Sequence, residues 1–286
     1  TTTRITTLFP YTTLFRSVQA ARLRTLPLSL SGIIVGTALA TYQGHFSAVI
    51  FVLAMLTTIG FQVISNFAND YGDGVKGTDN EDRIGPARAL QSGIITRGSL
   101  KKGIIVSAIL TLLIALVLIY KAFGLENLPY IVLFFALGLL SIWAAIKYTV
   151  GSNAYGYRGM GDLFVPAASI GLLCVAVLNL NNLRDMVSDK KHGKITLVVK
   201  MGFDKGKIYH GFLIVMALLC FAAFIWVERF GVKSSFFMLA FVPLLIHLRK
   251  VVKTQNPKDL DPELKKVALS TFLLAVLFLI SVNIFL

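Results

Sequence analysis

Long stretches without a charged side chain constrain this 286-residue chain more than any other feature. Hydrophobic residues make up 56% of it, charged residues only 15%, and the mean hydropathy is +0.75, outside the range of soluble globular proteins. A helix needs about 18 to 20 apolar residues to cross a bilayer core. We therefore expect an all-α, multi-spanning transmembrane bundle with about eight spans. The uncharged runs are Leu26–Gly44, Phe46–Asn69, Gly103–Tyr120, Asn127–Ile146, Leu163–Leu183, Ile208–Val227, Val267–Leu286 and the shorter Ser234–Leu248.

Positive charge is concentrated in a few loops. The chain has 28 Lys and Arg against 14 Asp and Glu, a net charge of +14. In a soluble protein this excess would suggest a nucleic-acid partner, but in a membrane protein basic loops mark the cytoplasmic side. We expect the lipid bilayer and no nucleic acid as a partner, with a multi-pass location in the inner (plasma) membrane and cytoplasmic active-site loops.

The first 17 residues do not fit the rest of the chain. Thr1–Ser17 has no acidic residue and no helical stripe, and Phe9–Ser17 looks like the translation of a sequencing-library adapter. We expect residues 1–17 to be a non-native leader and residues 18–286 to form a single transmembrane domain.

Two acidic clusters lie at the ends of uncharged runs. The first, N-F-A-N-D-Y-G-D, covers Asn66–Asp73, and the second, N-N-L-R-D-M-V-S-D, covers Asn181–Asp189. Side chains three, four or seven positions apart share one face of a helix. The side chains with this spacing are Asn66, Asp70 and Asp73 in the first cluster and Asp185 and Asp189 in the second.

Carboxylates at membrane depth are costly and usually functional. Mg²⁺ is typically held by one or two carboxylates together with substrate phosphates. Two clusters that face each other would hold a diphosphate through Mg²⁺. The alternative is that the acids only cap helices and keep loops hydrophilic. Basic residues that could neutralise a diphosphate interleave with the acids: Lys76, Arg88, Arg184 and Lys194.

A third polar segment, Y-G-Y-R-G-M-G-D, covers Tyr155–Asp162. No strand precedes its glycines, so it does not fit a nucleotide-binding loop. We expect a cytoplasmic loop that offers Tyr155, Arg158 and Asp162 to the same pocket. The four histidines show no metal-ligand spacing, and we expect them in loops or at the membrane interface.

Counting spans leads to a contradiction. With a cytoplasmic N-terminus, the first cluster and the Tyr155–Asp162 loop are cytoplasmic, but only Leu163–Leu183 separates that loop from the second cluster. The second cluster and the basic loops after it would then lie outside. One more span would correct all of them, so we expect a deletion of about 20 to 30 residues near Val165–Pro166. A re-entrant half-helix broken at Pro166 is the alternative.

Four motifs resemble one family. They are N-D-Y-G-D-G-V-K-G-T-D at Asn69–Asp79, G-P-A-R-A-L-Q-S-G at Gly85–Gly93, Tyr155–Asp162 and N-N-L-R-D-M-V-S-D-K-K-H-G-K-I-T-L at Asn181–Leu197. Over Ala21–Leu286 the chain is similar to the intramembrane aromatic prenyltransferases of the UbiA superfamily, most closely to members that act on 1,4-dihydroxy-2-naphthoate in menaquinone synthesis. The resemblance implies nine helices around a central cavity, with both acidic clusters cytoplasmic. This chain departs from the family by lacking the fifth helix.

The resemblance also implies an activity. It is Mg²⁺-dependent transfer of a polyprenyl group from polyprenyl diphosphate to 1,4-dihydroxy-2-naphthoate, with loss of CO₂ and diphosphate, to give demethylmenaquinol. Asp162, near Tyr155 and Arg158, would orient or deprotonate the acceptor. Residues implied for the donor site are Asp70, Asp73, Asp185 and Asp189 as Mg²⁺ ligands, Asn66, Asn69 and Asn182 in support, and Lys76, Arg88 and Lys194 beside the diphosphate.

Three alternatives stay open at this point. The acceptor could be homogentisate, 4-hydroxybenzoate or a tetrapyrrole. The intramembrane acids could serve an ion-coupled transporter, although such proteins tend to show internal repeats or broken helices at the midplane. The chain could also be an inactive, truncated product.

Overall fold

The structure is a computed structural model that describes residues 18, 20–77, 88–93, 95–147, 149–150 and 169–285. All regular secondary structure within these residues is helical, as expected. The helices are the 3₁₀ segments η1 (Leu23–Thr25), η4 (Phe236–Ala240) and η5 (Pro257–Leu260), and α2 (Leu26–Tyr42), α3 (Ala48–Lys76), α4 (Arg97–Phe123), α5 (Leu128–Lys147), α6 (Ser169–Lys191), α7 (Leu197–Met201), α8 (Phe203–Val227), α9 (Phe241–Lys253) and α10 (Asp261–Phe285).

Seven helices in the described part of the chain are long and apolar enough to cross a membrane, one fewer than expected. The eighth run, Ser234–Leu248, forms η4 and the 13-residue α9 instead. A helix of that length spans about 20 Å, which is short of a bilayer core of about 30 Å. Lys250 and Lys253 occupy its last turn, where they end the apolar stretch.

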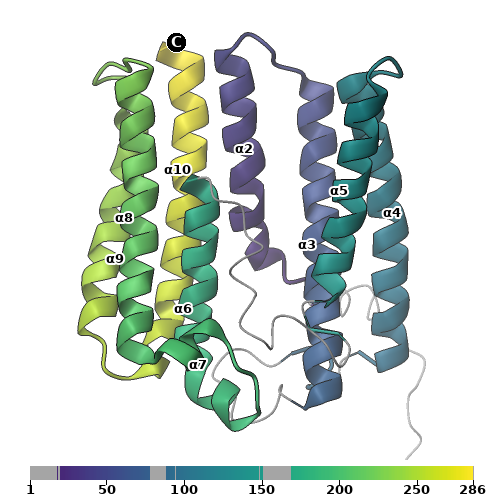
Figure 1. Ribbon diagram of the computed structural model, residues 1–286, viewed down its shortest axis with the longest axis vertical. Helices are drawn as coiled ribbons and strands as arrows, with labels where there is room; N and C mark the ends of the chain where they lie inside the picture. The colour runs from purple at the N-terminus through teal and green to yellow at the C-terminus, as the bar shows by residue number, and fades with distance from the viewer. Residues whose placement is uncertain are drawn as a thin grey trace, which may run out of the picture.

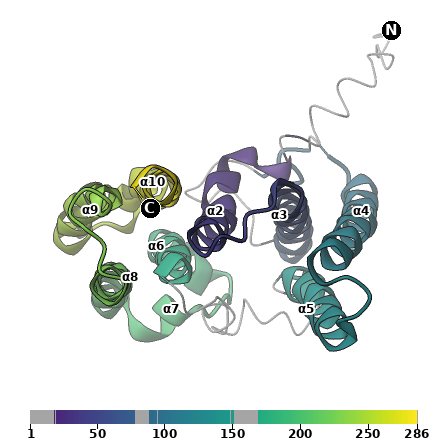
Figure 2. The ribbon, with the colours of Figure 1, turned by 90° about the horizontal axis from the view of Figure 1, so that it is seen from above.

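The helices form an upright bundle (Figure 1). Seen from above, α2, α3, α4 and α5 gather on one side and α6, α8, α9 and α10 on the other (Figure 2). The closest packing joins α3 to α4, α2 to α10 and α6 to α8. Helix α2 therefore connects the two groups.

Both acidic clusters lie at the same end of the bundle. Helices α3, α5 and α6 all run towards the lower end in Figure 1, and α6 begins at about mid-height. Simple counting of spans would place the second cluster at the opposite end, and that placement is wrong because α5 and α6 run in the same direction. Residues 148–168, which join them, are mostly outside the described part, so the choice between a deleted span and a half-helix broken at Pro166 stays a prediction.

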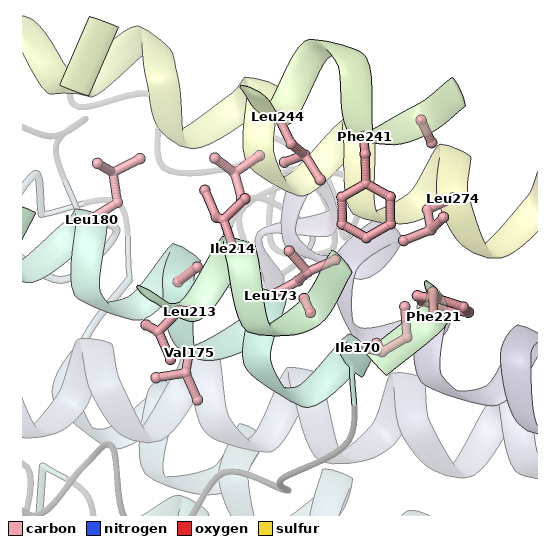
Figure 3. Packing of buried hydrophobic residues seen from close by; sticks show 14 of the residues in the cluster. Ile170, Leu173, Val175, Leu180, Leu213, Ile214, Phe221, Phe241, Leu244 and Leu274 are labelled. Carbon is pink, nitrogen blue, oxygen red and sulfur yellow. The ribbon is translucent and has the colours of Figure 1, made fainter. Parts of the chain in front are cut away.

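Aromatic and aliphatic side chains fill the space between α6, α8, α9 and α10 (Figure 3). Phe278 on α10 packs against Phe237 and Phe221, with ring centroids 5.0 and 5.7 Å apart. These fully or almost fully buried rings interlock edge to face, an arrangement that aromatic pairs prefer. The second acidic cluster is therefore carried by a helix with a fixed place in the core.

A buried polar chain crosses the same group of helices. Nε2 of His210 on α8 lies 2.8 Å from Nε2 of His247 on α9, and Nδ1 of His247 lies 2.7 Å from Oε2 of Glu263 on α10. Glu263 also pairs with Lys250 and Lys266. The expectation of a loop is wrong for this pair, since both side chains are buried on helices. Their polar partners come from other helices and cannot be recognised from spacing.

Helices α3 and α4 approach closely at Gly60. A Cβ atom placed on Gly60 would lie 2.1 Å from Oγ1 of Thr111 and 2.9 Å from its Cβ. Thr111 is buried, and its hydroxyl donates to the carbonyl of Ser107, so it cannot easily turn away. The absence of a side chain at Gly60 allows this contact.

We predict that Gly60→Ala destabilises the bundle by about 1 to 3 kcal/mol, because the new methyl group overpacks the α3–α4 contact. Thermal unfolding in detergent measures the effect. Gly138→Ala on α5 is the matched control, since no atom lies within 4 Å of a Cβ at that position. Equal melting temperatures for the two variants would contradict the prediction.

Candidate active site

The first acidic cluster is helical throughout, because α3 continues to Lys76 and ends at Gly77, whose left-handed backbone (φ 72°) closes the helix. Asp70 and Asp73 are therefore on one face, as predicted from their spacing. Both are almost fully buried, with 1% and 5% of their surface exposed. A buried carboxylate needs a compensating charge or hydrogen bonds.

Two arginines supply that charge. The guanidinium of Arg22, just before η1, pairs with Oδ1 of Asp70. Nη1 of Arg88 lies 2.9 Å from the same oxygen, and Nη2 of Arg88 lies 3.8 Å from Oδ2 of Asp73. Arg88 was predicted to lie beside the diphosphate. In this structure its guanidinium contacts Asp70 and Asp73 of the first cluster.

Asn66 holds the N-terminal segment against α3. Its Nδ2 donates to the carbonyl of Ala21 at 2.7 Å and to Oγ1 of Thr25 at 3.2 Å, and its Oδ1 accepts from Nε2 of Gln62 at 3.2 Å. Both ends of the amide are thus used within the protein. In this structure Asn66 positions the chain around Arg22.

Asn69 has a similar role on another side of α3. The buried Thr149, which follows α5, donates from Oγ1 to the carbonyl of Ala68 at 3.0 Å and to Oδ1 of Asn69 at 3.2 Å. A Cβ on Gly72 would lie 2.6 Å from the Thr149 backbone. Gly72 is therefore needed for the end of α5 to approach the first cluster this closely.

Arg184 dominates the second acidic cluster. Its Nε and Nη2 donate to Oδ1 and Oδ2 of Asp185 at 2.8 and 2.6 Å, which is a bidentate pair. Nη2 also donates to Asn181, and Nη1 donates to Asp261 at the start of α10, at 2.7 Å. Arg184 is buried and oriented by these acceptors, so in this structure it positions Asp185. Its predicted contact with the substrate stays a prediction.

The remaining residues of the second cluster face the first. Oδ1 of Asp189 lies 3.5 Å from Nζ of Lys194, and Asn182 is buried on the same helix, α6. Asp189 also interacts electrostatically with Asp73, and Lys76, which is exposed, interacts with both Asp73 and Lys194. Members of the two clusters are therefore within electrostatic range of each other at the same end of the bundle.

The donor set fits a divalent cation bound together with a phosphate. Oδ2 of Asp70 and Oδ2 of Asp189 are buried and have no hydrogen-bond partner among the described residues, so each cluster has a carboxylate oxygen to offer. Within the described residues no three His, Cys, Asp or Glu side chains group closely enough to hold an ion by themselves. Mg²⁺ is commonly bound by one or two carboxylates completed by water and phosphate oxygens, which matches this arrangement.

An apolar cavity of about 640 Å³ lies between α2, α6, α8 and α10. Ser29 of α2 lines it and donates to Oε1 of Gln62, which in turn donates to Asn66. This chain of hydrogen bonds connects the cavity to the first cluster. Other lining residues are Gly32, Gly36, Cys174, Cys220, Phe224 and Phe278.

Three predicted residues, Tyr155, Arg158 and Asp162, lie outside the described residues. Their assignment to the acceptor stays a prediction.

Sequence reasoning missed several residues that organise the site. Arg22, Thr149 and Asp261 lie outside the motifs recognised in the sequence. Gln62 could have been found, because it precedes Asn66 by one helical turn on the same face of α3. The others come from distant segments and reach the clusters only through tertiary packing.

Similarity to known proteins identifies the family of this chain. Residues 29–125 and 118–276 match the model of the UbiA prenyltransferase family. This chain belongs to that family. It is 40% identical to 1,4-dihydroxy-2-naphthoate octaprenyltransferase of Escherichia coli (strain K12), over 93% of this chain and 94% of the relative. It is 42% identical to the Haemophilus influenzae protein of the same name, over 91% of this chain and 93% of the relative.

Solved structures show the same fold. A UbiA homolog from Archaeoglobus fulgidus, determined bound to GPP and Mg²⁺, superposes with a TM-score of 0.62 at 14% identity, over 94% of this chain and 99% of that one. Digeranylgeranylglyceryl phosphate synthase gives a TM-score of 0.57 at 19% identity, over 94% and 98%. The expectation of a UbiA-type helical bundle is confirmed.

If the two clusters face each other, cysteines replacing Lys76 and Lys194 will be cross-linked by a short bis-maleimide. The background carries Cys174→Ala and Cys220→Ala, because these are the natural cysteines. The matched control pairs Lys76→Cys with Lys121→Cys at the opposite end of the bundle. A mobility shift on gel electrophoresis is expected for the first pair only, and equal cross-linking of both pairs would contradict the geometry.

Proposed function

We propose that this enzyme transfers a polyprenyl group from polyprenyl diphosphate to 1,4-dihydroxy-2-naphthoate, with release of CO₂ and diphosphate, in menaquinone synthesis. The observation that carries the proposal is the convergence of Asp70, Asp73, Asp185 and Asp189 at one end of a UbiA-type bundle. The names of relatives at 40% and 42% identity support the acceptor and the prenyl donor.

The acids and the cations have different roles in binding the diphosphate. Asp70 and Asp189 each offer a buried, unpartnered oxygen to Mg²⁺, and Asp73 and Asp185 complete the two clusters. Mg²⁺ neutralises charge that develops on the leaving diphosphate. Arg88, Lys76 and Lys194 lie next to these acids and stabilise the same charge as fixed cations.

The cavity suits the prenyl chain. Its lining is almost entirely apolar, and the Ser29–Gln62–Asn66 connection places its polar edge next to the first cluster. An allylic diphosphate could therefore keep its head among the acids and its tail between α2, α6, α8 and α10. Burial of the tail excludes water from the site, which protects the reactive carbon from hydrolysis.

The reaction balances without an additional reagent. The C–O bond of the allylic diphosphate breaks, and its electron pair leaves with the diphosphate. The ring carbon that bears the carboxylate forms a C–C bond to the allylic carbon. The ring–carboxylate bond then breaks, CO₂ leaves, and the electron pair restores the aromatic ring. We assign the orientation of the acceptor to Asp162, Tyr155 and Arg158.

We propose further that the active-site loops are cytoplasmic and that the membrane is the inner (plasma) membrane. Most lysines and arginines of the described residues lie in loops or helix segments at the lower end of the bundle in Figure 1, with the acids, whereas Lys121, Arg229 and Lys233 lie towards the upper end. This distribution is that of cytoplasmic loops.

The aligned lengths support the proposed loss of one span. The alignment with the E. coli protein is 292 positions long and includes 93% of this 286-residue chain, which is about 266 residues. About 26 positions of the relative therefore have no counterpart in this chain. The same comparison with the H. influenzae protein leaves about 29. One membrane helix with a short loop needs about that many residues.

Membranes that contain the enzyme should form the decarboxylated prenyl product from dihydroxynaphthoate, a polyprenyl diphosphate and Mg²⁺, as detected by mass spectrometry. We expect Asp70→Asn and Asp185→Asn to lower the rate by about 100-fold or more, because each removes charge that holds the leaving group. Glu126→Gln, an exposed acid at the opposite end, is the control and should not change the rate. Full activity without Mg²⁺ or in both Asp variants would exclude the mechanism.

The missing span can be restored by inserting the additional residues of the E. coli relative between Val165 and Pro166. We expect the insertion to raise the rate of product formation by at least about tenfold. The reason is that misplacing reacting groups by about 1 Å can lower a reaction rate by about 10²-fold. The comparison is made at equal protein in membranes, with a scrambled apolar insert of the same length as control. If the unmodified chain is as active as the restored one, a half-helix broken at Pro166 is the better explanation of its topology.

A further inference from the structure

Arg22 has an unusual backbone and a buried partner. Its φ and ψ are 51° and 58°, in the left-handed region that residues other than glycine rarely adopt. Its side chain is only 15% exposed and pairs with Asp70. Strained conformations of this kind persist only where the surroundings determine them, and they cluster at functional sites.

The surroundings of Arg22 do determine its conformation. The carbonyl before it, on Ala21, accepts from Asn66, one helical turn ahead of Asp70. Its own carbonyl accepts from both the backbone N–H and the hydroxyl of Thr25, each at 2.9 Å. The position of the Arg22 backbone is thus fixed to α3, while its long side chain can still move.

The charges around Asp70 favour such a movement. Arg22 and Arg88 both contact Oδ1 of Asp70, and Oδ2 of the same carboxylate has no partner. A divalent cation on Oδ2 would lie close to two guanidinium groups in a buried site, where repulsion is poorly screened. Arg88 is shared with Asp73, whereas within the described residues Arg22 pairs with Asp70 alone.

We propose that Arg22 is an exchangeable counter-ion: it neutralises Asp70 in the metal-free enzyme and moves to the diphosphate of the prenyl donor when a divalent cation binds Asp70. This inference rests on the proposed function of the acidic clusters. A diphosphate gives the displaced guanidinium a new anionic partner, so cation and diphosphate binding become cooperative.

The test measures Mn²⁺ binding to the full chain in detergent by electron paramagnetic resonance, with and without inorganic diphosphate. Without diphosphate, we expect Arg22→Gln to bind Mn²⁺ about 5- to 100-fold more tightly than the unsubstituted enzyme, because the competing cation is gone. With diphosphate this advantage disappears or reverses. Arg22→Lys keeps the charge and should remain near the unsubstituted enzyme.

Arg24→Gln is the matched control. It removes the same charge only two residues from Arg22, but from a side chain that is exposed. Equal Mn²⁺ affinities for Arg22→Gln and Arg24→Gln, or weaker binding by Arg22→Gln without diphosphate, would overturn the proposal. Asp70→Asn separates the two levels of inference. If Asp70→Asn binds Mn²⁺ as tightly as the unsubstituted enzyme, the proposed function fails as well. If Asp70→Asn binds Mn²⁺ more weakly while Arg22→Gln and Arg24→Gln have equal affinities, only the proposed role of Arg22 fails.

Discussion

The neutralisation of buried carboxylates is the interaction on which the rest of this structure depends. Asp70 and Asp185 would be costly to bury alone. Each is held by guanidinium groups, from Arg22 and Arg88 in one case and from Arg184 in the other. These arginines come from the segment before η1, from the chain after α3 and from α6, and Arg184 is itself held by Asp261 of α10. Charge balance at one end of the bundle therefore joins the segments before η1 and after α3 to α3, and joins α6 to α10.

Under the proposed function, the same ion pairs compensate the acids until a dication and a diphosphate bind. Each fixed positive charge that now compensates an acid is also a possible partner for phosphate oxygens. A buried, unpartnered oxygen remains on Asp70 and on Asp189. The polar end of the molecule is thus organised for ligands of both signs, while the apolar cavity beside α2 has space for a hydrocarbon chain.

Periodicity and charge in the sequence predict the helical class and seven of the eight expected spans, because membrane thickness and helical geometry act locally. They do not predict the direct contacts. The ring pair of His210 and His247, the anchoring of Asn69 by Thr149 and the use of Asn66 to hold Ala21 all join segments far apart in the chain. Positive-inside counting showed a conflict in the placement of the second cluster, but the direction of α6 had to come from the structure.

The most direct test of a shared diphosphate site is a double-substitution cycle on binding. The affinity of a non-hydrolysable prenyl thiodiphosphate, with Mn²⁺ present, is measured for the unsubstituted chain, Asp73→Asn, Asp189→Asn and the double variant. If both clusters hold the same diphosphate, the losses should be non-additive by more than about 0.5 kcal/mol. Losses that add within about 0.5 kcal/mol would mean that the clusters act as independent sites, which would contradict the central claim.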